Sequence, residues 1–126
     1  MIEEQYVSFE TAKLLVQKGF DFNNAYTHYY TLNGEIIERN KGYELNVAPR
    51  VTQQMAMRWL REVHHIHIIA EPCLGEGNEP NLSFNRWFWT ILKEEGEYKP
   101  IRKIDEFPTY EEACEAAIKY CLTELI

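Results

Sequence analysis

The stretch that decides the fold is TQQMAMRWLREVHHIHIIAE, residues 52–71, in which a helical pattern gives way to the pattern of a strand. Thr52 can cap a helix over residues 52–64, because a threonine side chain accepts a hydrogen bond from a backbone amide of the first turn. Apolar side chains gather on one arc of this helix: Met55, Ala56, Trp59, Leu60 and Val63. The opposite arc holds Arg50, Gln54, Arg58 and Arg61. The pattern predicts an amphipathic helix with a basic outer face.

A strand over residues 65–71 follows, because its side chains alternate between two faces. One face carries Ile66, Ile68 and Ala70, and the other carries His65, His67 and Ile69. Two histidines on one face can hold a divalent ion when a third ligand arrives. The candidate metal site is therefore His65 and His67 with Cys73, or with His28 or Glu71 in place of the cysteine. No Cys-x-x-Cys or His-Glu-x-x-His spacing supports the metal site. The same residues would serve a small hydrolytic enzyme with Cys73 as nucleophile.

Two hairpins are predicted on either side of this stretch. The first pairs residues 25–32 with 35–39 across Asn33-Gly34, a dipeptide that tolerates the positive φ angles of a type I′ turn. The second pairs residues 84–94 with 97–102 across Glu95-Gly96. One further short strand is expected between the first hairpin and the helix. Residues 72–83, rich in proline, glycine and asparagine, are predicted to form a long loop.

Helices are also predicted near both ends of the sequence. Ser8 can cap a helix over residues 9–18, which Gly19 ends. Thr109 and Glu112 form a capping box at the start of a last helix, whose apolar face includes Cys114 and Cys121 as small core-filling side chains. The order αββαββα predicts one α+β domain over residues 1–126, in which three helices pack mainly on one face of an antiparallel sheet built from the two hairpins.

Composition limits the classes of function. With 126 residues, 45% of them hydrophobic and 26% charged, the chain resembles an ordinary single domain rather than a disordered or membrane-spanning one. Its net charge of -7 disfavours nucleic acid as a partner. An acidic inhibitor that imitates nucleic acid is a further alternative, but the acidic residues are spread along the sequence. The first residues show no signal peptide, so we expect a cytoplasmic protein without a membrane partner.

The aromatic content of 13% favours contact with another protein over an active site. Tyrosine, tryptophan and arginine are enriched at the centres of protein interfaces. The predicted interaction surface comprises Tyr26, Tyr29, Tyr30, Arg58, Arg61, Trp87 and Trp89. We expect a protein partner or self-association, without a catalytic residue, cofactor or small-molecule ligand.

Three segments carry a resemblance to a family: residues 7–15 (VSFETAKLL), 54–64 (QMAMRWLREVH) and 108–113 (PTYEEA). They resemble small proteins of unassigned activity that are encoded by gut Bacteroidetes and by their phages and mobile elements. The resemblance implies a setting rather than a chemistry: a phage-related or prophage-borne accessory protein in a bacterial cytoplasm. The leading hypothesis is therefore a non-enzymatic protein-interaction domain.

Overall fold

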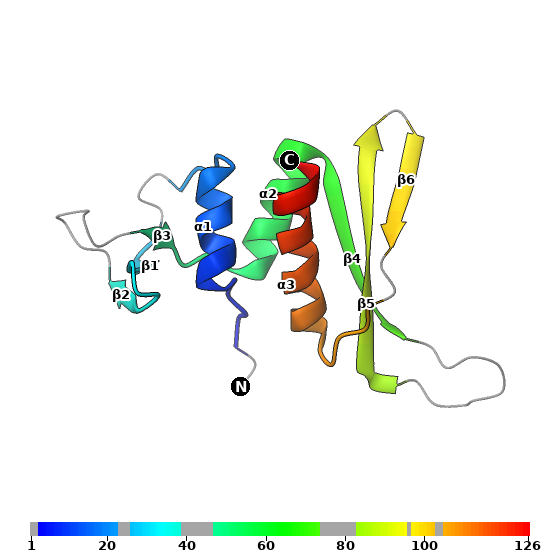
Figure 1. Cartoon of the computed structure of the whole chain (residues 1–126), viewed down its shortest axis with the longest axis horizontal. Helices are drawn as coiled ribbons and strands as arrows, with labels where there is room; N and C mark the ends of the chain where they lie inside the picture. Colours follow the sequence, from blue (N-terminus) through cyan, green and yellow to red (C-terminus); the bar gives the residue numbers. More distant parts are fainter. Residues whose placement is uncertain (1–2, 23–25, 39–46, 74–82, 96, 103–104) are drawn as a thin grey trace.

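In the computed structural model, residues 3–22, 26–38, 47–73, 83–95, 97–102 and 105–126 are described, and they form three helices and two small antiparallel sheets (Figure 1). The helices are α1 (Phe9–Gln17), α2 (Gln53–His64) and α3 (Tyr110–Tyr120), which continues into a π-helical segment, η1 (Cys121–Leu125). The strands are β1 (His28–Tyr30), β2 (Ile36–Glu38), β3 (Ala48–Pro49), β4 (Ile66–Cys73), β5 (Ser83–Glu95) and β6 (Glu97–Arg102). The mixed α+β class and the predicted order are confirmed, including the extra short strand before α2.

Both predicted hairpins form, but they lie in separate sheets rather than in one. β1 pairs with β2 and β5 pairs with β6, all antiparallel. Each hairpin gains its third strand from the segments that flank α2: β3 precedes the helix and joins β1, and β4 follows it and joins β5. The orders are β2-β1-β3 and β4-β5-β6. The predicted turn residue Gly96 and most of the predicted loop, residues 74–82, lie outside the described residues.

The helices occupy the space between the two sheets, and this placement keeps the hairpins apart (Figure 1). α3 packs on β4 and β5, α1 packs on β3, and α2 contacts both β4 and α3. The largest fully buried side chains come from every part of this arrangement, among them Leu15, Leu60, Ile66, Ile91, Ile118 and Leu122. A single core therefore joins both sheets through the helices.

All three predicted helix caps are present. The hydroxyl oxygens of Ser8, Thr52 and Thr109 each accept a hydrogen bond from the backbone amide three residues later, at 3.2, 3.1 and 3.1 Å. Each bond satisfies an amide that the first turn of a helix leaves without a partner. α1 also ends as predicted, because Gly19 has a φ of 91°.

The first hairpin turns differently from the prediction. The amide of Gly34 donates to the carbonyl of Thr31 at 2.9 Å, and the amide of Thr31 donates to the carbonyl of Glu35 at 2.8 Å. Gly34 has a φ of 79°, whereas His65 is the sole non-glycine residue with positive φ in the described ranges, so Asn33 does not adopt the type I′ conformation. The loop therefore has three residues and ends in a left-handed glycine, which is the second common hairpin geometry.

Replacing Gly34 by alanine is expected to cost about 2 kcal/mol of folding free energy, because left-handed backbone alone costs about 1–2 kcal/mol for a residue with a Cβ atom. The new Cβ would also lie 3.1 Å from the Phe9 ring. Gly19→Ala is the matched control, since its φ is equally positive but no atom lies within 4 Å of the added carbon. Urea unfolding measures both variants. Equal losses would show that the Phe9 contact adds nothing.

Candidate functional site

An apolar stripe runs along the exposed side of α2. Met55 and Val63 keep 42% and 55% of their surface accessible, and Trp59, midway between them, is half-buried. Their spacing of four residues places them one above another on one face of a helix. The prediction that this arc faces the core is therefore wrong for Met55 and Val63.

The buried side of α2 is rotated from the predicted arc because a polar residue takes a core position. Gln53 is 3% exposed, and its side-chain amide donates to the carbonyl of Glu111 in α3 at 2.9 Å. Ala56, Met57 and Leu60 complete the buried side. The chain thus covers only part of the apolar surface that this helix carries.

Aromatic contacts hold Trp59, the central residue of the stripe, in place. The Trp59 ring packs edge-on against Phe20, with centroids 5.5 Å apart, and against His64 at 4.7 Å. Burial lowers the pKa of His64, so the imidazole beside the indole stays neutral near neutral pH. A salt bridge of 3.0 Å between Arg58 and Glu62 flanks the stripe, and both side chains are exposed. The stripe is therefore a fixed apolar surface with one charged pair at its border.

The predicted interaction surface does not form as a unit, because its central aromatic residues are core. Tyr29, Tyr30 and Trp89 are 4%, 7% and 3% exposed. The Tyr30 hydroxyl donates to the carbonyl of Val7 at 2.7 Å, and the Trp89 ring lies 5.2 Å from that of Tyr120. These three residues are excluded from any contact surface.

The remaining predicted contact residues are divided between separate places. Trp87 is half-buried against Tyr110, with ring centroids 5.5 Å apart. Tyr26 is half-buried near Phe20. Arg58 and Arg61 are exposed on α2, as predicted, but Arg50 precedes the helix and lies over the Tyr6 ring instead of joining the basic face.

The three candidate metal ligands are not brought together. His65 is the left-handed C-cap of α2, with a φ of 55°, rather than the first residue of the strand as predicted, because β4 begins at Ile66. Its ring nitrogen and that of His67 on β4 lie 3.7 and 3.5 Å from the carboxylate of Glu94. Cys73 stands at the other end of β4, about 20 Å along the strand from His67 at the usual rise of about 3.3 Å per residue. The alternative ligand His28 belongs to the other sheet. Within the described ranges, no three His, Cys, Asp or Glu side chains form a group that could hold a metal ion.

The surroundings of Cys73 do not favour a nucleophile. Burial and the neighbouring carboxylate of Glu106, 3.9 Å from the sulfur, raise the pKa of the thiol. Glu106 is itself held by Arg86, whose Nε donates to it at 2.6 Å. A reactive cysteine needs a lowered pKa, because the thiolate is the attacking form. Cys114 and Cys121 are fully buried, as predicted, and burial raises the pKa of Cys121 to about 12.

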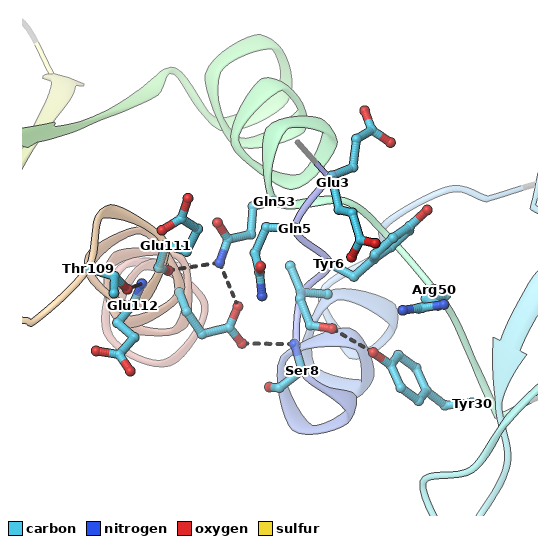
Figure 2. Close-up of a pocket in the computed structure, with 13 residues that line it drawn as sticks. Glu3, Gln5, Tyr6, Ser8, Tyr30, Arg50, Gln53, Thr109, Glu111 and Glu112 are labelled. Atoms are coloured by element: carbon cyan, nitrogen blue, oxygen red, sulfur yellow. Dashed lines mark hydrogen bonds between the residues drawn. The ribbon is translucent and has the colours of Figure 1, made fainter. Parts of the chain in front are cut away.

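A groove of about 630 Å³ lies where the N-terminal ends of α1 and α3 approach the start of α2 (Figure 2). Five glutamates line it: Glu3, Glu4, Glu111, Glu112 and Glu115. Glu115 is committed to the fold, because its carboxylate accepts from the Ser8 amide at 3.0 Å and from the Thr11 hydroxyl at 2.7 Å. The groove is acidic, and the Glu115 carboxylate within it accepts hydrogen bonds that join α3 to α1.

Comparisons with known proteins give no relative: no family model matches the chain, and neither a curated protein nor a solved structure matches it significantly. Among the described residues, no helix combines the length and apolar character that crossing a membrane requires.

Proposed function

We propose that this chain is a non-enzymatic protein-interaction domain that associates with a second copy of itself through the α2 stripe, defined as Met55, Trp59 and Val63. The exposed apolar stripe carries the proposal. From the sequence resemblance we further propose that the protein acts in a bacterial cytoplasm as an accessory factor of a phage or mobile element.

The stripe has the composition of an interface centre. Methionine and tryptophan are enriched in interface cores, and truncating a buried tryptophan commonly costs more than about 2 kcal/mol of binding energy. Apolar surface removed from water contributes roughly 25 cal/mol per Å². Met55 and Val63 are exposed on the isolated chain, so this contribution is still available for association.

The stripe is complementary to itself. When two α2 helices lie antiparallel about a twofold axis at Trp59, Met55 of one copy faces Val63 of the other. The border charges can then pair between copies, because the twofold axis sets Arg58 of one copy two positions along the helix from Glu62 of the other. Both side chains are exposed, by 59% and 58% of their surface. Each can exchange its partner within the helix for the oppositely charged residue of the second copy.

The expected dimer is weak. A stable interface buries about 800 Å² on each partner, more than three side chains supply. Association should therefore depend on protein concentration, with a dissociation constant in the micromolar range.

Val63→Glu is expected to weaken the dimer by about tenfold or more, which corresponds to about 1.4 kcal/mol. A carboxylate at position 63 would face Met55 of the second copy and lose hydration without gaining a partner. Sedimentation equilibrium over a concentration series measures the constant.

Leu32→Glu is the control, because Leu32 is 80% exposed at the tip of the first hairpin and lies outside the stripe. It should leave the constant unchanged. A wild-type chain that stays monomeric at every concentration, or an equal effect of both substitutions, would refute the proposal.

A further inference from the structure

A second, smaller concavity of about 200 Å³ shares the lining residues Tyr6 and Arg50 with the acidic groove. It is lined by Tyr6, Tyr26, Thr27, His28, Arg50 and Thr52. None of these lining residues is acidic, although the chain as a whole carries a charge of -7. Arg50 thus lines both a concavity with basic and hydroxyl groups and the groove with five glutamates.

Backbone pairing explains how these side chains come to share one face. The amide of Arg50 donates to the carbonyl of His28 at 3.0 Å, which continues the β1–β3 ladder by one position. Tyr6 forms a bridge with Thr52 on the opposite side of the same segment. Since residues opposite one another on neighbouring strands point to the same face, His28 and Arg50 lie next to each other on it.

The guanidinium of Arg50 contacts both the Tyr30 hydroxyl and the Tyr6 ring, whereas its Nε is left without a partner among the described residues. Its central carbon lies 4.0 Å from the centre of the Tyr6 ring, so the aromatic face fixes its position. Its Nε atom is buried and has no hydrogen-bond partner within the described part of the chain. A buried donor without a partner is costly, so a shift of the Arg50 side chain that brings this Nε–H to an acceptor on a ligand would recover energy.

The neighbouring groups are hydrogen-bond donors or aromatic walls. His28 uses Nδ1 in a 3.0 Å contact with the Thr27 hydroxyl, and its ring is exposed. The hydroxyl of Thr52 accepts from the Met55 amide at 3.1 Å and keeps its own hydrogen for another acceptor. Glu38 is opposite His28 on β2 but does not line the concavity.

We propose that this concavity, defined as the Arg50 site, binds a phosphate monoester group. Arginine forks match the paired oxygens of phosphate, and several hydroxyl and imidazole donors around one cation suit a group with three acceptor oxygens better than a carboxylate with two. The tyrosine walls would contact whatever organic group carries the phosphate. The group recognised is the phosphate monoester itself, and the test below separates it from free phosphate.

The test is a two-dimensional NMR titration of the full chain that follows the Arg50 Nε–H and His28 signals. The probes are inorganic phosphate, phenyl phosphate and sodium acetate at equal ionic strength. Saturable shifts with phenyl phosphate, weaker ones with inorganic phosphate and none with acetate are expected. Stronger binding of inorganic phosphate would assign the site to the free ion rather than to a monoester and would overturn the proposal, as would equal shifts with acetate or no saturable shift.

Arg50→Gln should weaken phenyl phosphate binding about tenfold or more, the scale expected for a charge-assisted bidentate contact. Arg61→Gln removes the same charge from the exposed side of α2 and should change the affinity by less than about twofold. Circular dichroism verifies the fold of each variant. If Arg50→Gln does not fold, His28→Gln at an exposed position replaces it, and an unchanged affinity there would contradict the site. Val63→Glu should bind phenyl phosphate normally, so the failure of the dimer and of this site are separable.

Discussion

Replacing Trp89 by alanine is expected to lower the free energy of unfolding by about 4 kcal/mol, within the range of about 3–5 kcal/mol for large aromatic residues in a core. Trp89 is 3% exposed and lies on the inner face of β5, against Tyr120 of α3. The substitution leaves a cavity at the contact between the larger sheet and the helix that covers it. Urea unfolding monitored by circular dichroism measures the loss.

Ile69→Ala provides the control for Trp89. Ile69 lies on the opposite, outer face of the same sheet and keeps 38% of its surface exposed. Its truncation should cost less than about 1 kcal/mol. A small loss for Trp89→Ala, comparable with that of Ile69→Ala, would contradict the core position of Trp89. It would favour the predicted interaction surface, which includes Trp89.

Replacing Glu115 by alanine is the second large effect, with an expected loss of about 3 kcal/mol, since a hydrogen bond to a charged group contributes about 1.5–3 kcal/mol. Its carboxylate accepts from the Ser8 amide and the Thr11 hydroxyl at the N-terminus of α1, and lies 3.5 Å from the side-chain amide of Gln53. Thr11 and Gln53 are 0% and 3% exposed, so water cannot readily replace the lost acceptor. The negative charge also lies at the positive end of the α1 dipole.

Glu112→Ala tests whether the Glu115 effect arises from charge alone. Glu112 is exposed in the first turn of α3, the helix that also carries Glu115. Its truncation removes an equal charge without removing the hydrogen bonds from Ser8 and Thr11 to Glu115. We expect a change within about 0.5 kcal/mol. Similar losses for both glutamates, measured by urea unfolding, would show that α3 and α1 are not joined through Glu115.

Local signals in the sequence predict local structure well. Ser8, Thr52 and Thr109 cap their helices as expected, because a cap depends on residues only three positions apart. Alternation along β4 also places Ile66 and Ile69 on opposite faces, as predicted, and the structure shows that Ile66 is buried and Ile69 exposed. These features need no knowledge of the rest of the fold.

Features that depend on distant contacts could not be predicted in this way. In α2 the polar Gln53 is buried and bonded to Glu111, 58 residues away, whereas Met55 and Val63 are exposed. The linking role of Glu115 depends on partners more than a hundred residues away. His65 and His67 both lie near Glu94, but strand periodicity is not the reason, since His65 is a left-handed helix cap outside β4. The length of β4 places Cys73 beyond their reach.

The most direct test of the central claim is a charge exchange across the α2 stripe. Arg58→Glu alone and Glu62→Arg alone each place like charges opposite one another in the twofold dimer, so each variant should be largely monomeric. An equimolar mixture should dimerise, because the heterodimer restores both pairs of opposite charge. Sedimentation equilibrium of the two variants and their mixture at one ionic strength measures this. Recovery of the dimer in the mixture is the predicted result, and a mixture no more associated than its components would contradict self-association through α2.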